Sequence, residues 1–263
     1  MRSSQTNRRA AAAPIAHDRK AERTSAPDDN EAQRVTDPRI IKVYELGTTD
    51  YDEVHSLQRR LQQQRREGEG TDSLLLTEHR PVITLGRSHP EPDLRVPPPT
   101  LDEYGIRVVQ TERGGDITYH GPGQLVAYGI VDLKAWEIGV VDYAALLEQT
   151  VIGVLADWGV KGEQVPAARG VWVGGRKIAS LGINVRRWVT MHGIALNIDP
   201  DMSHFDLINS CGMPDVEMTS LSAEVAKQVP MPDAVEAFVF HFGRVFECAT
   251  ETVDVGKRPA RRA

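Results

Sequence analysis

The sequence predicts one α/β (α+β) domain, a mixed and largely antiparallel sheet with helices packed against it. Short apolar runs typical of strands alternate with segments of helical periodicity. Several connections between the predicted strands are too short for the crossovers that parallel strands need. No change of composition between residues 39 and 250 marks a linker, and 40% of the 263 residues are hydrophobic, which is enough for one sizeable core. We therefore expect a single domain over residues 38–250.

The first half of this domain predicts a strand, a helix and then a series of short strands. Residues 40–46 alternate as a strand does, and Tyr51, Val54 and Leu57 begin an amphipathic helix. Residues 90–100 are rich in proline and are expected to form a loop. The further strands are predicted over residues 73–77, 82–85, 106–110, 116–120 and 124–131.

The second half predicts a helix, three strands and a closing helix. Residues 143–158 are apolar at helical period and stop before Gly159, a C′ glycine. Residues 203–209 are expected to form a short helix or turn, and residues 233–246 the closing helix. The three strands are predicted over residues 170–173, 177–185 and 191–198.

The two ends of the chain are basic, whereas the body is acidic. Residues 1–26 carry a net charge of +4 and residues 256–263 another +4, so the net charge of −6 leaves −14 on the body. This distribution disfavours nucleic-acid binding, which normally uses a basic patch on the folded domain. Residues 1–37 contain almost no large apolar side chain and are expected to be a disordered tail, as residues 251–263 are a basic C-terminal tail.

The features of the sequence that relate to localisation predict a cytoplasmic protein. No apolar run reaches the length of a membrane span, and the first residues hold no apolar core of a secretory signal. Two cysteines, Cys211 and Cys248, fit a reducing compartment. A transit-peptide role for the N-terminal tail stays open as the alternative to a solvated extension.

The densest polar segment is Arg113-Gly-Gly-Asp-Ile-Thr-Tyr-His-Gly-Pro-Gly-Gln124. Its four glycines permit unusual backbone conformations and close approach to a ligand, and Arg113, Tyr119 and His120 supply hydrogen-bond donors. The alternative is a glycine-punctuated β-hairpin with incidental polar residues. The segment matches neither a P-loop nor a GxGxxG fingerprint, so it does not imply a nucleotide.

Two further residues are candidates for chemistry. Lys177 opens an otherwise apolar strand, where it either extends to solvent or is held, partly buried, as a base. Cys211 lies on a turn-like stretch before Gly212, so it is either an accessible nucleophile or an inert thiol. Cys248, near the closing helix, is expected to pack as a buried thiol. No CxxC, HxxxH or HExxH spacing occurs, and we expect no metal site.

Together these segments resemble the octanoyl-acyl carrier protein:protein octanoyltransferase family. The twelve residues 113–124 look like the family signature. Four supporting blocks occur in the family's order, so that the resemblance covers about residues 40–250. They are Glu78-His-Arg-Pro-Val-Ile-Thr-Leu-Gly-Arg87, Arg176-Lys-Ile-Ala-Ser-Leu-Gly182, His192-Gly-Ile-Ala-Leu-Asn197, and Cys211-Gly-Met-Pro with Thr219-Ser-Leu221.

The resemblance implies the biotin/lipoate protein ligase catalytic fold and a transfer reaction. An octanoyl group would pass from acyl carrier protein to a lysine of lipoyl domains, in 2-oxoacid dehydrogenase complexes and the glycine cleavage H protein. Cys211 would be the acyl-thioester nucleophile and Lys177 the group that lowers its pKa or acts as its base. No cofactor is implied beyond the phosphopantetheine of the carrier. The implied acyl-binding residues are Arg113, Gly114, Gly115, Asp116, Ile117, Thr118, Tyr119, His120, Ser180, Leu181, Gly182, Gly193, Ile194 and Ala195.

The nearest alternative is an ATP-dependent lipoate or octanoate ligase of the same fold. Such ligases do not depend on a cysteine at this place, so Cys211 favours the transferase. A second alternative is an amidotransferase that moves the acyl group between lipoyl proteins. A third, a non-catalytic acyl or lipoyl-domain binding protein, is disfavoured because both Lys177 and Cys211 are present.

Overall fold

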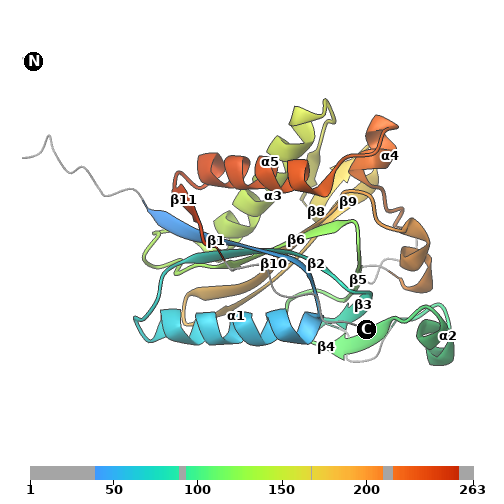
Figure 1. Cartoon of the computed structure of the whole chain (residues 1–263), viewed down its shortest axis with the longest axis horizontal. Helices are drawn as coiled ribbons and strands as arrows, with labels where there is room; N and C mark the ends of the chain where they lie inside the picture. Colours follow the sequence, from blue (N-terminus) through green and yellow to red (C-terminus); the bar gives the residue numbers. More distant parts are fainter. Residues whose placement is uncertain (1–38, 89–92, 167, 210–215, 255–263) are drawn as a thin grey trace, which may run out of the picture. The chain divides into compact units, whose positions relative to one another are not determined.

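The main architectural element is an eight-stranded mixed sheet, with α3 and α5 on one face and α1 on the other (Figure 1). The computed structural model describes residues 39–88, 93–166, 168–209 and 216–254, all within one unit of the chain, Pro38–Ala263. The strand order is β11-β1-β2-β6-β10-β9-β8-β7. These strands are β1 Ile40–Thr49, β2 Ser73–His79, β6 Gln124–Ile130, β7 Glu163–Val165, β8 Ala168–Val173, β9 Arg176–Arg186, β10 Val189–Asn197 and β11 Ala249–Thr252.

A second, three-stranded sheet has the order β4-β3-β5, with β3 Val82–Leu85, β4 Arg107–Gln110 and β5 Ile117–His120. Strand β1 pairs in parallel with β2 and β11, and β3 pairs in parallel with β4. The other pairs are antiparallel. The predicted mixed, largely antiparallel arrangement is confirmed, although the strands divide between two sheets.

Helix α1, Tyr51–Arg66, follows the predicted apolar spacing and buries Tyr51 and Val54. Its first turn holds Asp52 and its last turn Arg66, charges that complement the helix dipole. On the opposite face, α3 (Val140–Asp157) and α5 (Met231–Val245) pack together over the sheet and enclose the largest apolar cluster. No helix among the described residues is long and apolar enough to cross a bilayer.

The structure corrects the sequence interpretation at four short elements. The proline-rich segment, predicted as loop, contains helix α2, Pro98–Glu103, because proline is well suited to the first turn of a helix. The exposed strand β7 and the five-residue helix α4, Leu221–Val225, were not predicted, since both are too short to show a period. Strand β11 runs to Thr252, so the folded part continues beyond residue 250 through its pairing with β1.

Candidate active site

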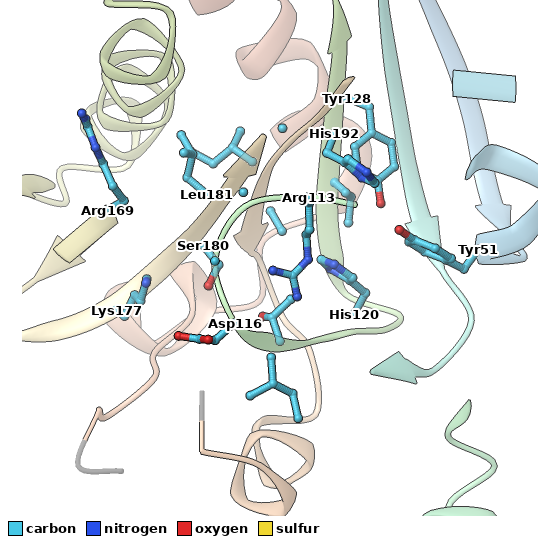
Figure 2. Close-up of a pocket in the computed structure, with 18 of the residues that line it drawn as sticks. Tyr51, Arg113, Asp116, His120, Tyr128, Arg169, Lys177, Ser180, Leu181 and His192 are labelled. Atoms are coloured by element: carbon cyan, nitrogen blue, oxygen red, sulfur yellow. The ribbon is translucent and has the colours of Figure 1, made fainter. Parts of the chain in front are cut away.

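A cavity of about 220 Å³ lies on the face of the main sheet that α1 covers (Figure 2). Most of the expected acyl-binding residues meet in it, together with Lys177. Gly114 and Tyr119 are not among its lining residues, and Cys211 lies outside the described residues. The expected residues that line the cavity are Arg113, Gly115, Asp116, Ile117, Thr118, His120, Lys177, Ser180, Leu181, Gly182, Gly193, Ile194 and Ala195.

Two rows of residues across three strands form the floor of the cavity. Ala195 on β10 is in register with Ser180 on β9 and Val126 on β6. Two residues further along, Gly193 is in register with Gly182 and Tyr128. The alternation of a strand places residues two apart on the same face, so both rows face α1.

The loop of residues 112–116 covers one side of this floor, because it packs directly on β9. The Gly114 amide donates to the Ile183 carbonyl (2.9 Å), and the Asn184 side-chain amide donates to the Glu112 carbonyl (2.9 Å). A Cβ atom on Gly182 would lie only 2.9 Å from the Gly114 carbonyl oxygen. Glycine at position 182 therefore permits the close approach of the loop.

Arg113 holds the loop from its other side. Its buried guanidinium donates to the Thr84 side chain (3.0 and 3.1 Å), to the Thr84 carbonyl (2.5 Å) and to the Gly114 carbonyl (3.1 Å). These bonds fasten the loop to β3 of the small sheet. The glycine-rich segment thus forms part of the cavity wall rather than a simple hairpin.

Tyr119 belongs to a different environment. Its ring packs in the apolar cluster of the small sheet, and its hydroxyl hydrogen-bonds with the His204 ring (2.8 Å). Burial raises the pKa of Tyr119 to about 12. Gly114, by contrast, contributes its amide to the contact with β9. Tyr119 and Gly114 therefore support the cavity wall without lining the cavity.

Lys177 is buried, with 2% of its surface exposed, and its ammonium lies 5.4 Å from the centroid of the Trp172 ring. The Lys177 amide donates to the Glu217 carbonyl (2.8 Å), and the Thr219 amide donates to the Lys177 carbonyl (2.9 Å). The backbone of β9 at Lys177 is thus hydrogen-bonded to residues 217 and 219. Of the two alternatives for Lys177, burial excludes the one in which it extends to solvent.

The other end of the cavity carries polar rings that burial keeps neutral. Burial lowers the pKa of His79 to about 4 and the pKa of His120 to about 3, and it lowers the pKa of His192 as well. His79 hydrogen-bonds with the Tyr128 hydroxyl (2.8 Å), and His120 with the Gln124 side chain (2.6 Å). At neutral pH the two histidines that line this end, His120 and His192, are therefore uncharged.

Beside this end, Glu112 joins the loop to α1 and β10. Its carboxylate accepts from Arg59 (3.0 Å) and lies 2.9 Å from His55 Nε2 and 3.8 Å from His192 Nε2. Burial raises the pKa of Glu112, but the Arg59 guanidinium and the His192 and His55 rings beside the carboxylate keep that pKa well below the usual range.

The three ligand atoms of His55, Glu112 and His192 lie within 4.8 Å of one another, so this group is the candidate cation site among the described residues. No spacing in the sequence brings these three residues together, because they come from three distant segments.

The cavity also has lining residues that sequence reasoning missed. They share no motif, and an aromatic or small residue on an amphipathic element is indistinguishable from core in a sequence. Tyr51 is an example, because in the sequence it is only the first apolar residue of α1. The missed residues are Tyr51, Val126, Tyr128, Ala168 and Arg169.

Comparison with known proteins agrees with this fold. The family described as lipoyl protein ligase A/B catalytic domain matches residues 50–243. Among solved structures, the bi-partite lipoate protein ligase of Thermoplasma acidophilum superposes with a TM-score of 0.61 at 12% identity, covering 81% of this chain and 86% of that one. The fold is therefore the biotin/lipoate ligase catalytic fold, as the resemblance implied.

Curated relatives identify the family of this chain more narrowly than the family model does. The octanoyltransferase of Syntrophobacter fumaroxidans is 48% identical over 202 residues, which cover 77% of this chain and 89% of the relative. The octanoyltransferase of Solibacter usitatus is 43% identical over 203 residues, covering 77% and 91%. The chain belongs to the octanoyltransferase family and is an acyltransferase of that type.

Proposed function

We propose that this acyltransferase moves an octanoyl group from acyl carrier protein to a lysine of lipoyl domains, through a thioester on Cys211. The observation that carries the proposal is the burial of Lys177 at one end of a largely apolar cavity. A buried ammonium beside the reacting centre favours the thiolate form of a nearby cysteine.

The connection of the chain supports Cys211 as the partner of Lys177. Only five residues separate Cys211 from Glu217, whose carbonyl accepts from the Lys177 amide. The other cysteine, Cys248, is half-buried, and burial raises its pKa to about 11. It packs against the main apolar cluster rather than in the cavity, so Cys211 is the better nucleophile.

The proposed reaction has two steps. In the first, the Cys211 thiolate attacks the carbonyl of the octanoyl-phosphopantetheine thioester, and the carrier's carbon–sulfur bond breaks. The released carrier thiolate takes the proton that Lys177 removed from Cys211. In the second, the amine of the acceptor lysine attacks the acyl-enzyme and forms an amide. The Cys211 sulfur leaves and receives the amine's proton by way of Lys177.

This route needs no cofactor of its own, because the donor thioester is already activated. Exchange between two thioesters is nearly balanced in energy, and amide formation then makes the transfer favourable. The acceptor class we infer is the lipoyl domain of 2-oxoacid dehydrogenase complexes and of the glycine cleavage H protein. Activation by ATP, as in a ligase of the same fold, is the alternative that the test must exclude.

Intact-mass measurement tests the proposal directly. The full chain is incubated with octanoyl-acyl carrier protein without ATP, and an apo lipoyl domain is then added. We expect one added octanoyl group on the enzyme, which the lipoyl domain discharges and retains. The adduct should be absent in Cys211→Ala.

Cys248→Ala is the matched control, since it removes the chain's other cysteine from a packing position. It should form the adduct as the unaltered protein does. An adduct that survives in Cys211→Ala but not in Cys248→Ala would overturn the assignment of the nucleophile. Product that forms only with ATP would mean that the protein is a ligase and not a transferase.

A further inference from the structure

The end of the cavity remote from Lys177 is closed by Tyr51, at the start of α1. Figure 2 shows Lys177 and Tyr51 on opposite sides of the cavity, with the Tyr51 hydroxyl directed into it. Tyr51 is 2% exposed, so its ring fills the space between α1 and the sheet.

The neighbours of the Tyr51 ring show which strands of the main sheet it lies against. Its ring lies 5.2 Å from the His79 ring at the end of β2, and 5.4 Å from the His55 ring one turn along α1. His79 in turn hydrogen-bonds with Tyr128 on β6. The Tyr51 ring is therefore held beyond β6, at the β2 side of the cavity floor.

The distance that the floor covers matches an acyl chain of eight carbons. The floor runs from Ser180 on β9 across Ala195 on β10 to Val126 on β6. Two strand spacings of about 4.8 Å give a length of about 10 Å. A fully extended eight-carbon chain, with carbon–carbon bonds of about 1.5 Å, spans about 9 Å. A chain whose carbonyl lies on the Lys177 side would end against Tyr51.

The chemistry of this end wall opposes a longer chain. Among the described residues, neither the Tyr51 hydroxyl nor His192 Nε2 has a hydrogen-bond partner, and both atoms are buried. An alkyl chain pressed further against them would displace any water from two polar atoms and leave them unpaired. Steric closure by the ring and the cost of burying these atoms therefore act in the same direction.

We propose that Tyr51 is the residue that sets the acyl chain length of this transferase, with its ring as the stop at eight carbons. The inference rests on the proposed function, because it takes the acyl group to lie in this cavity. It assigns a specificity role to a residue of α1, outside every motif of the sequence.

The experiment compares hexanoyl, octanoyl, decanoyl and dodecanoyl carrier proteins as donors for the full-length protein and for Tyr51→Ala. We expect kcat/KM to peak at eight carbons in the unaltered protein. In Tyr51→Ala, the ratio of decanoyl to octanoyl kcat/KM should rise tenfold or more, the usual effect of accommodating even one methylene in an apolar pocket. Tyr51→Leu, which leaves less empty space, should give the same shift if the alanine variant does not fold.

Two controls separate chain length from general loosening. Tyr51→Phe keeps the ring, so the peak should stay at eight carbons. Tyr44→Ala removes a tyrosine that packs against the apolar cluster between α1 and the sheet and does not line the cavity, and it should keep the original ranking of donors. An unchanged ranking in both Tyr51→Ala and Tyr51→Leu would overturn the inference.

Binding of free fatty acids of six to twelve carbons, measured by displacement of a fluorescent fatty acid, separates this inference from the reaction. If the unaltered protein transfers no octanoyl group, the proposed function fails. The shift of the binding optimum to longer acids in Tyr51→Ala then still decides the role of the residue. An optimum that does not move would reject it.

Discussion

Acid should destabilise this protein well above the pH at which its carboxylates titrate, because two buried histidines stay neutral. Burial lowers the pKa of His79 to about 4 and of His120 to about 3, against about 6.5 in the unfolded chain. Between these values the unfolded chain binds more protons than the folded one. The free energy of unfolding therefore falls as pH falls. Each histidine removes about 1.4 kcal/mol per pH unit in this window, so both remove about 4 kcal/mol between pH 7 and pH 5.

Urea unfolding of the full chain at pH 7, 6 and 5 measures this slope. Carboxylates of the unfolded chain, with pKa values near 4, contribute little in this range. His120→Asn should lower the free energy of unfolding at pH 7 and reduce the slope between pH 6 and 5 by the roughly 1.4 kcal/mol per pH unit that one such histidine contributes. Leu74→Ala, a large-to-small change in the main core, should lower stability equally at each pH. Equal slopes in His120→Asn and the unaltered protein would refute the reasoning.

Three other substitutions, one of them with a matched control, test the site. Gly182→Ala places a Cβ 2.9 Å from the Gly114 carbonyl oxygen, so unfolding free energy in urea should fall by about 1–3 kcal/mol and octanoyl transfer should drop. Gly159→Ala, which meets nothing within 4 Å, should cost about 1 kcal/mol and keep transfer. Lys177→Met should slow acyl-enzyme formation by about a hundredfold or more, with recovery toward pH 9 in a pH–rate profile. Glu112→Gln should cost about 1 kcal/mol or less, because its carboxylate is about a third exposed, and unfolding in high salt should show a smaller difference.

The local pattern of apolar residues predicts the helices and strands that bury an apolar face. It does not predict elements or pairings that burial does not determine. The apolar run Val82–Leu85 and the spacing from Tyr51 along α1 follow directly from side chains that face the core. The division into two sheets has no local signal, since the parallel partner of β3 is β4, some twenty residues along the chain. Helix α2 was read as loop because its prolines mark loops and first helical turns alike.

The candidate site divides in the same way. Segments that pack closely on one another through glycines carry a signature, because a Cβ atom on Gly182 or Gly193 would clash with neighbouring backbone. Residues that line the cavity with ordinary side chains, such as Tyr51 and Val126, are indistinguishable from core by their type. The Glu112 pairing with His55 and Arg59 depends on three-dimensional contact between the loop and α1, which no spacing encodes.

The register of the main sheet explains how one cavity holds both a cation and a place for an alkyl chain. Lys177 and Gly182 lie five residues apart on β9, so the ammonium is well separated from the floor row that Gly182 forms with Gly193 and Tyr128. The ammonium lies by the Trp172 ring, whereas burial keeps the histidines of the other end uncharged. An apolar chain that crosses the strands thus leaves the charge behind at its carbonyl end. The charge is where the proposed thioester chemistry needs it, and the residues of the two floor rows beyond it are uncharged.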